Sequence, residues 1–122
     1  MGFNLIENDN VIISPKIRNL AMLFGIPVNL GGYLYIVYAI SYMAFSQHCE
    51  VRFLSEVYKS IAETFDSTSE CVEISIRNAI KSAGNRKTGK YKEYFGESDK
   101  KPSNALFLNT LKEIFLIEQG KI

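Results

Sequence analysis

The sequence predicts an all-α domain of five to six helices with an embedded helix-turn-helix. Apolar residues recur at spacings of three or four along most of the chain, and no segment shows the sustained alternation typical of a strand. A length of 122 residues suits one domain with a substantial core, and no repeat or linker divides it. We expect residues 1–13 to form a loose N-terminal arm and residues 14–122 to form the helical domain.

The N-terminal half of the domain is expected to hold three helices. Serine suits a helix cap and proline the first helical position, so Ser14-Pro15 predicts the start of the first helix. Gly25 predicts its end. A second helix is expected at residues 33–45, and a polar corner at residues 47–50 leads to a third helix at about 53–65.

The C-terminal half is expected to add two longer helices and one short helical turn. Apolar residues at helical spacing predict a fourth helix at residues 69–83, which Gly84-Asn85 ends. A short turn at residues 90–95 is closed by Gly96, and Pro102-Ser103-Asn104 introduces the last helix.

A long stretch between Arg18 and Glu50 contains no charged residue. A membrane span requires roughly 20 consecutive apolar residues, whereas glycines, Pro27 and Asn29 interrupt this stretch and leave residues 33–45 as its longest apolar run. That run spans roughly 20 Å as a helix, which is less than the bilayer core. We therefore expect no membrane partner and interpret the run as the central buried helix of the domain.

Residues 58–77 are typical of a helix-turn-helix. A polar break separates two apolar groups, and Ala62 supplies a small residue where two short helices cross. Ser67, Thr68 or Ser69 is suited to cap the second helix. If this helix enters the major groove of DNA, the residues on its outer face that read bases are Ser69, Glu70, Glu73, Ile74 and Arg77.

The net charge of +1 conceals an uneven distribution of charge. Six basic residues and no acidic one lie between residues 77 and 92, while six acidic residues and two basic ones lie between residues 50 and 73. Such a basic run is usually a solvated loop, but next to a helix-turn-helix it also suits phosphate contacts. The expected partner is double-stranded DNA, with phosphates bound by Ser67, Thr68, Asn78, Lys81, Arg86, Lys87, Lys90 and Lys92.

Catalytic and metal-binding chemistry has no support in the sequence. Cys49 and Cys71 have neither metal-like nor redox-like spacing, and His48 is the single histidine. The carboxylates are scattered, and the glycines do not form a phosphate-binding loop. We expect no enzyme activity, no metal and no cofactor. Because residues 1–10 do not resemble a signal peptide, we expect reduced cysteines in a cytoplasmic protein.

The chain also resembles a known family over about residues 14–118. The most specific matches are the runs Gly32-Tyr33-Leu34-Tyr35 and Ile76-Arg77 followed by Ala79-Ile80. The other matching residues are Gly25-Ile26-Pro27, Ala39-Ile40, Tyr58, Ile61-Ala62, Phe65, Thr68, Val72-Glu73, Ala83, Phe95-Gly96, Lys101-Pro102, Asn104 and Phe107. In these residues the chain is similar to the C-terminal effector domain of the stage-zero sporulation master regulator of endospore-forming bacteria.

The resemblance implies a sequence-specific DNA-binding transcription regulator with an all-α fold. Members of the family bind a short box of the TGTCGAA type, often as tandem copies on adjacent boxes, and activate or repress transcription with RNA polymerase. The resemblance therefore allows RNA polymerase as a partner and self-association on tandem sites. The resemblance makes residues 69–83 the recognition helix. Glu73 is then suited to accept a hydrogen bond from cytosine N4, and Arg77 to contact a phosphate or a guanine.

Four positions depart from the family pattern. Cys71 and Ile74 stand where the family typically has arginine, Asn78 where it often has histidine, and Gly84 in place of a tryptophan. An arginine can bond guanine bidentately, whereas an isoleucine can at most pack on a thymine methyl group. Two functions therefore stay open: a regulator that reads bases, or a divergent protein-interaction module that modulates a regulator or RNA polymerase without reading bases.

Overall fold

A computed structural model describes residues 14–45 and 54–120 of the chain. The loose arm expected at residues 1–13 and the polar corner expected at residues 47–50 lie outside the described residues. Within the described ranges every regular element is a helix, which confirms the all-α fold class. The six helices are α2 (Pro15–Leu23), α3 (Gly31–Phe45), α4 (Leu54–Phe65), α5 (Ser69–Arg86), α6 (Gly89–Phe95) and α7 (Asn104–Glu118).

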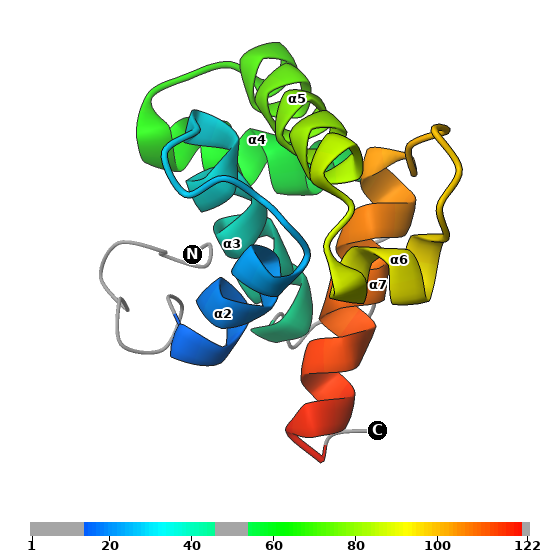
Figure 1. Ribbon diagram of the computed structural model, residues 1–122. Helices are drawn as coiled ribbons and strands as arrows, with labels where there is room; N and C mark the ends of the chain where they lie inside the picture. The colour runs from blue at the N-terminus through cyan, green and yellow to red at the C-terminus, as the bar shows by residue number, and fades with distance from the viewer. Residues whose placement is uncertain (1–13, 46–53, 121–122) are drawn as a thin grey trace.

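The helix α3 is the centre of the fold, and α2, α4, α5 and α7 all contact it (Figure 1). Its side chains from Ile36 to Ser41 are all buried, so the helix is apolar around most of its circumference, as expected for the charge-free stretch. The buried hydroxyl of Ser41 donates to the carbonyl oxygen of Val37 at 2.8 Å, which satisfies it within the helix. No helix of the described residues is long and apolar enough to cross a membrane.

The second helix begins two residues earlier than the sequence indicates, at Gly31. The reason is packing against α5, because Gly32 lies where the two helices approach most closely. A Cβ atom on Gly32 would stand 2.3 Å from the backbone oxygen of Ser75 and 2.8 Å from the Cβ of Ala79. Gly32 therefore serves as a small residue inside α3 at the crossing with α5, and not as part of a loop before the helix.

The turn between α4 and α5 is short and is stabilised by its own polar groups. Asp66 adopts a left-handed backbone conformation with φ +56°, one that aspartate tolerates better than most residues, and this ends α4. The N–H of Ser67 then donates to the carbonyl oxygen of Ala62 at 2.8 Å. Of the three cap candidates, Thr68 is the one used, since its hydroxyl accepts from the N–H of Cys71 at 3.1 Å.

The predicted end of the fourth helix is wrong, because α5 continues through Gly84 and Asn85 to Arg86. Lys87 ends it in a left-handed conformation with φ +48°, and its N–H donates to the carbonyl oxygen of Ala83 at 2.9 Å. A Cβ on Gly84 would stand 2.8 Å from the Cγ of Lys101 and 2.9 Å from the hydroxyl of Tyr91. Gly84 is thus a close-approach position within the helix rather than a helix terminator.

The remaining helix starts agree with the sequence. Ser14 caps α2 by accepting from the N–H of Lys16 at 3.1 Å, and Ser103 caps α7 by accepting from the N–H of Leu106 at 3.1 Å. The short turn expected near residues 90–95 is α6, which ends at Gly96. Thr88 caps α6 and also donates to the carbonyl oxygen of Leu23 at 2.7 Å, so it fastens α6 to the end of α2.

Candidate nucleic-acid interface

The helix α5 divides into a buried face and an exposed face. All of its aliphatic residues except Ile74 face the core, and the buried set is Val72, Ile76, Ala79, Ile80 and Ala83, together with Gly84. The opposite face is open to solvent over the whole helix, which extends roughly 27 Å at 1.5 Å per residue. We call this the exposed stripe, and it consists of Ser69, Glu70, Ile74, Arg77, Asn78, Lys81 and Asn85, with Cys71 exposed beside its first turn.

The structure places all five expected base-reading residues on the N-terminal half of α5. Ser69, Glu70, Ile74 and Arg77 are exposed, whereas Glu73 is half-buried at the edge of the exposed stripe. No part of the chain described by the structure covers these residues, so the outer surface of the helix is open toward a partner. Whether they read bases stays a prediction.

Glu73 and Arg77 form an ion pair one turn apart on α5. The Nη2 of Arg77 lies 3.0 Å from the Oε1 of Glu73, and both side chains are open to solvent. An exposed pair with this spacing is worth only about 0.3–0.5 kcal/mol. A phosphate or a base edge can therefore compete for either side chain at small cost to the fold.

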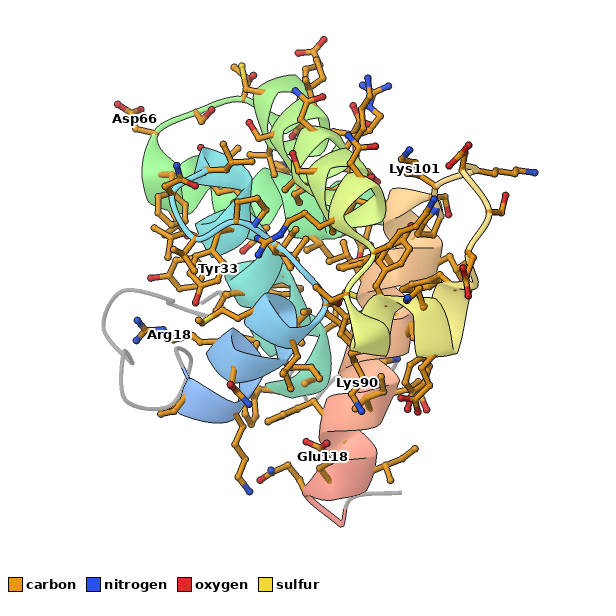
Figure 2. The ribbon with its side chains drawn as sticks, viewed as in Figure 1. Arg18, Tyr33, Asp66, Lys90, Lys101 and Glu118 are labelled. Carbon is orange, nitrogen blue, oxygen red and sulfur yellow. The ribbon has the colours of Figure 1, made fainter. Side chains whose placement is uncertain are left out.

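The expected phosphate-binding residues fall into two groups. Ser67, Thr68, Asn78 and Lys81 lie at the turn or on the exposed stripe, close to the expected base-reading residues in the chain. The second group, Arg86, Lys87, Lys90 and Lys92, lies at the far end of α5 and on α6. Figure 2 shows the separation, since Asp66 marks the α4–α5 turn at one end of the molecule and Lys90 points away from it on α6.

Three of the four residues of the second group have partners within the domain. The Nζ of Lys87 lies 2.8 Å from the Oδ1 of Asp99, and the Nζ of Lys90 lies 3.6 Å from the Oε1 of Glu93. Lys87 lowers the pKa of the Asp99 carboxyl, first by its hydrogen bond and then by its charge. The guanidinium of Arg86 reaches the carbonyl oxygen of Gly25 at 3.5 Å. In the described part of the chain, Lys81 and Lys92 make no ion pair.

One contact that positions α5 was not expected from the sequence. The Nδ2 of Asn104 donates to the hydroxyl of Tyr58 at 3.0 Å and to the carbonyl oxygen of Glu73 at 3.2 Å. This side chain at the start of α7 thereby joins α4 to α5 behind the exposed stripe. Burial raises the pKa of the Tyr58 phenol above its ordinary value of 10.0, while the hydrogen bond from Asn104 opposes that shift.

The rest of the described surface offers little chemistry. A shallow groove of about 310 Å³ lies between α6 and the start of α7, lined by Tyr94, Phe95, Lys100, Lys101, Pro102, Ser103 and Leu106. Among the described residues no group of three histidine, cysteine, aspartate or glutamate side chains is arranged to hold a metal ion. The one described cysteine, Cys71, is exposed and forms no disulfide with a described residue.

A tight three-residue turn, a capped second helix and a core that leaves one face of that helix open define a helix-turn-helix domain. The model of the family described as the sporulation initiation factor Spo0A C terminal matches residues 17–114. The chain belongs to this family, whose domain is a DNA-binding regulator of transcription in sporulation and not a known type of enzyme. The expected resemblance is thereby confirmed over most of the described helices.

Proposed function

We propose that this chain binds DNA in a sequence-specific manner and regulates transcription, with α5 in the major groove. The observation that carries the proposal is the exposed stripe, which presents solvent-exposed side chains on a helix whose opposite face is buried in the core. A helix of this kind fits the major groove, and its N-terminal residues are the ones that reach base edges in helix-turn-helix complexes. The residues of the N-terminal half of α5 that we assign to this role are Ser69, Glu70, Glu73, Ile74 and Arg77.

Phosphate contacts follow from the same placement. The N-terminus of α5 presents backbone N–H groups toward the region that a DNA backbone would occupy, and the hydroxyl of Thr68 keeps its own hydrogen available while its oxygen caps the helix. Lys81 adds a charge on the exposed stripe that makes no ion pair with a described residue. Arg86, Lys87, Lys90 and Lys92 extend the basic surface beyond α5 and suit a longer stretch of duplex.

The experiment is a titration of DNA selected from a random pool, carried out at several salt concentrations. Each phosphate neutralised contributes roughly −0.9 to the slope of log K against log salt. The variant Lys81→Gln should therefore reduce the slope by about one such unit at every bound sequence. Lys16→Gln, which removes an exposed charge from α2, is the matched control and should leave the slope unchanged. Absence of DNA binding at low salt would refute the proposal.

A second candidate function is a protein-interaction module that modulates another regulator or RNA polymerase. The observation in its favour is the apolar character of the exposed stripe near its start, where Ile74 is 46% exposed and the thiol of Cys71 is exposed. Light scattering after size-exclusion chromatography, with and without DNA, separates the two functions and also tests self-association on tandem sites. A stable complex with RNA polymerase in the absence of DNA binding would favour this second function.

A further inference from the structure

Two uncharged side chains, Ile74 and Asn78, lie at the centre of the exposed stripe, next to Arg77. Ile74 is left 46% exposed by the described residues, although burying such a side chain is worth about 1.5–3 kcal/mol. Asn78 follows one turn later and is also exposed. Charged residues lie on both sides, with Glu70 before this pair and Lys81 after it. The middle of α5 therefore offers an apolar side chain and an amide.

These two side chains match two specific groups of the major groove. The 5-methyl of thymine is the apolar group exposed there, and isoleucine has no polar atom with which to bond any other base edge. An asparagine amide both donates and accepts, which matches adenine N7 and N6 in a bidentate arrangement. Both groups belong to A·T pairs.

The spacing of the pair agrees with the spacing of bases. Residues four apart on a helix lie on the same face, and their Cα atoms are separated by roughly 6 Å along the axis. Successive bases rise roughly 3.4 Å along each strand. Ile74 and Asn78 therefore face base pairs that are one or two steps apart.

We propose that Ile74 and Asn78 make α5 specific for A·T pairs at the centre of its site, with Ile74 on a thymine methyl and Asn78 on adenine. The proposal rests on the proposed DNA-binding function. It gives Asn78 a base contact in place of the phosphate contact that we expected from the sequence. Arg77 and Glu73, which form an ion pair with each other, then contact bases or orient the helix at the edge of the site.

The test is a comparison of the selected DNA with copies in which single thymines are replaced by uracil, which removes only the methyl group. Loss of the methyl contacted by Ile74 should weaken binding by the full chain about fourfold, as expected for one buried carbon. The variant Ile74→Ala should bind the thymine and uracil forms equally. Leu106→Ala, which truncates an apolar side chain of α7 that is 54% exposed, is the control and should keep the difference.

Two further variants make the assignment specific. Ile74→Arg should select guanine at the position where the wild type selects thymine, because arginine bonds O6 and N7 of guanine. Asn78→Ala should lose at least about fivefold in affinity and become insensitive to 7-deazaadenine, which lacks the N7 acceptor. Both sites are exposed, so melting temperatures should stay at the wild-type value and show that the variants are folded.

The results separate this inference from the function on which it rests. If no DNA is bound at low salt, both fail. If DNA is bound but uracil replaces thymine at every position without effect, the A·T assignment fails and the DNA-binding function stands. The assignment would also be overturned if the DNA selected by the wild-type protein carried guanine at the position that Ile74 contacts.

Discussion

The crossing of α3 and α5 at Gly32 gives the sharpest prediction about the fold. The substitution Gly32→Ala should destabilise the domain, because the new Cβ would stand 2.3 Å from the backbone oxygen of Ser75. Ordinary contact for a Cβ begins near 3.4 Å. The two helices must therefore separate by about 1 Å at this point, and a backbone atom cannot move aside as a flexible side chain can.

The magnitude follows from the cost of overpacking a well-packed core, about 1–3 kcal/mol, which a clash with backbone places toward the upper end. A domain of this size loses roughly 4 °C of melting temperature per kcal/mol. We expect Gly32→Ala to lower the melting temperature by about 8–12 °C. The clash also moves α5, so DNA affinity should fall even at temperatures where the variant is folded.

The neighbouring glycine is a matched control. A Cβ on Gly31 would meet nothing within 4 Å, and alanine is the better helix former by about 1 kcal/mol. Gly31→Ala should therefore leave the melting temperature unchanged or raise it. Thermal unfolding followed by circular dichroism measures both variants. Equal melting temperatures for the two would refute the close approach of α3 and α5 at Gly32.

Three other predictions follow from the packing around α5. Asn104→Ala removes hydrogen bonds to Tyr58 and to the Glu73 carbonyl, and urea unfolding should show a loss of about 1–2 kcal/mol. Tyr91→Phe should raise stability by about 1 kcal/mol, because the buried Tyr91 hydroxyl has no hydrogen-bond partner among the described residues. Burial raises the folded-state pKa of the Tyr58 phenol above 10.0. The stabilisation of the fold linked to this shift is complete below about pH 10 and is lost as pH rises through the folded-state pKa. Above about pH 10 the melting temperature should therefore fall less steeply in Tyr58→Phe than in the wild type.

The helix starts were predictable because the relevant chemistry is local. Ser14 followed by proline, Thr68 three residues before Cys71, and Ser103 three residues before Leu106 each place a hydroxyl within reach of an unpaired N–H. The central buried helix was predictable for a similar reason, since a run without charge has only the core to occupy.

The end of α5 was not predictable, because the reason for Gly84 lies elsewhere in the chain. Locally a Gly-Asn pair is typical of a helix end, but here the glycine admits the side chain of Lys101 and the hydroxyl of Tyr91. The contact of Asn104 with Tyr58 and Glu73 was hidden for the same reason, since it joins residues 46 and 31 positions apart. Tertiary contacts at such separations leave no periodicity in the sequence.

The structure changes the interpretation of the basic run, residues 77–92, more than that of any other segment. Six positive charges lie between residues 77 and 92, but Arg77, Lys87 and Lys90 each lie within 4 Å of a carboxylate. If DNA phosphates displaced none of these carboxylates, three charges would remain and the salt slope would be roughly −2.7; if all were displaced, it would be roughly −5.4. Each exposed ion pair is worth at most about 1 kcal/mol, which is less than the 1.5–3 kcal/mol of a hydrogen bond to a charged group. A phosphate that reaches one of these side chains therefore displaces its carboxylate partner. The measured slope therefore reports how far along α5 and α6 the duplex extends. The two positive charges of the exposed stripe, Arg77 and Lys81, give roughly −1.8, so a value near −2 confines the duplex to the exposed stripe and a value near −5 brings it to α6.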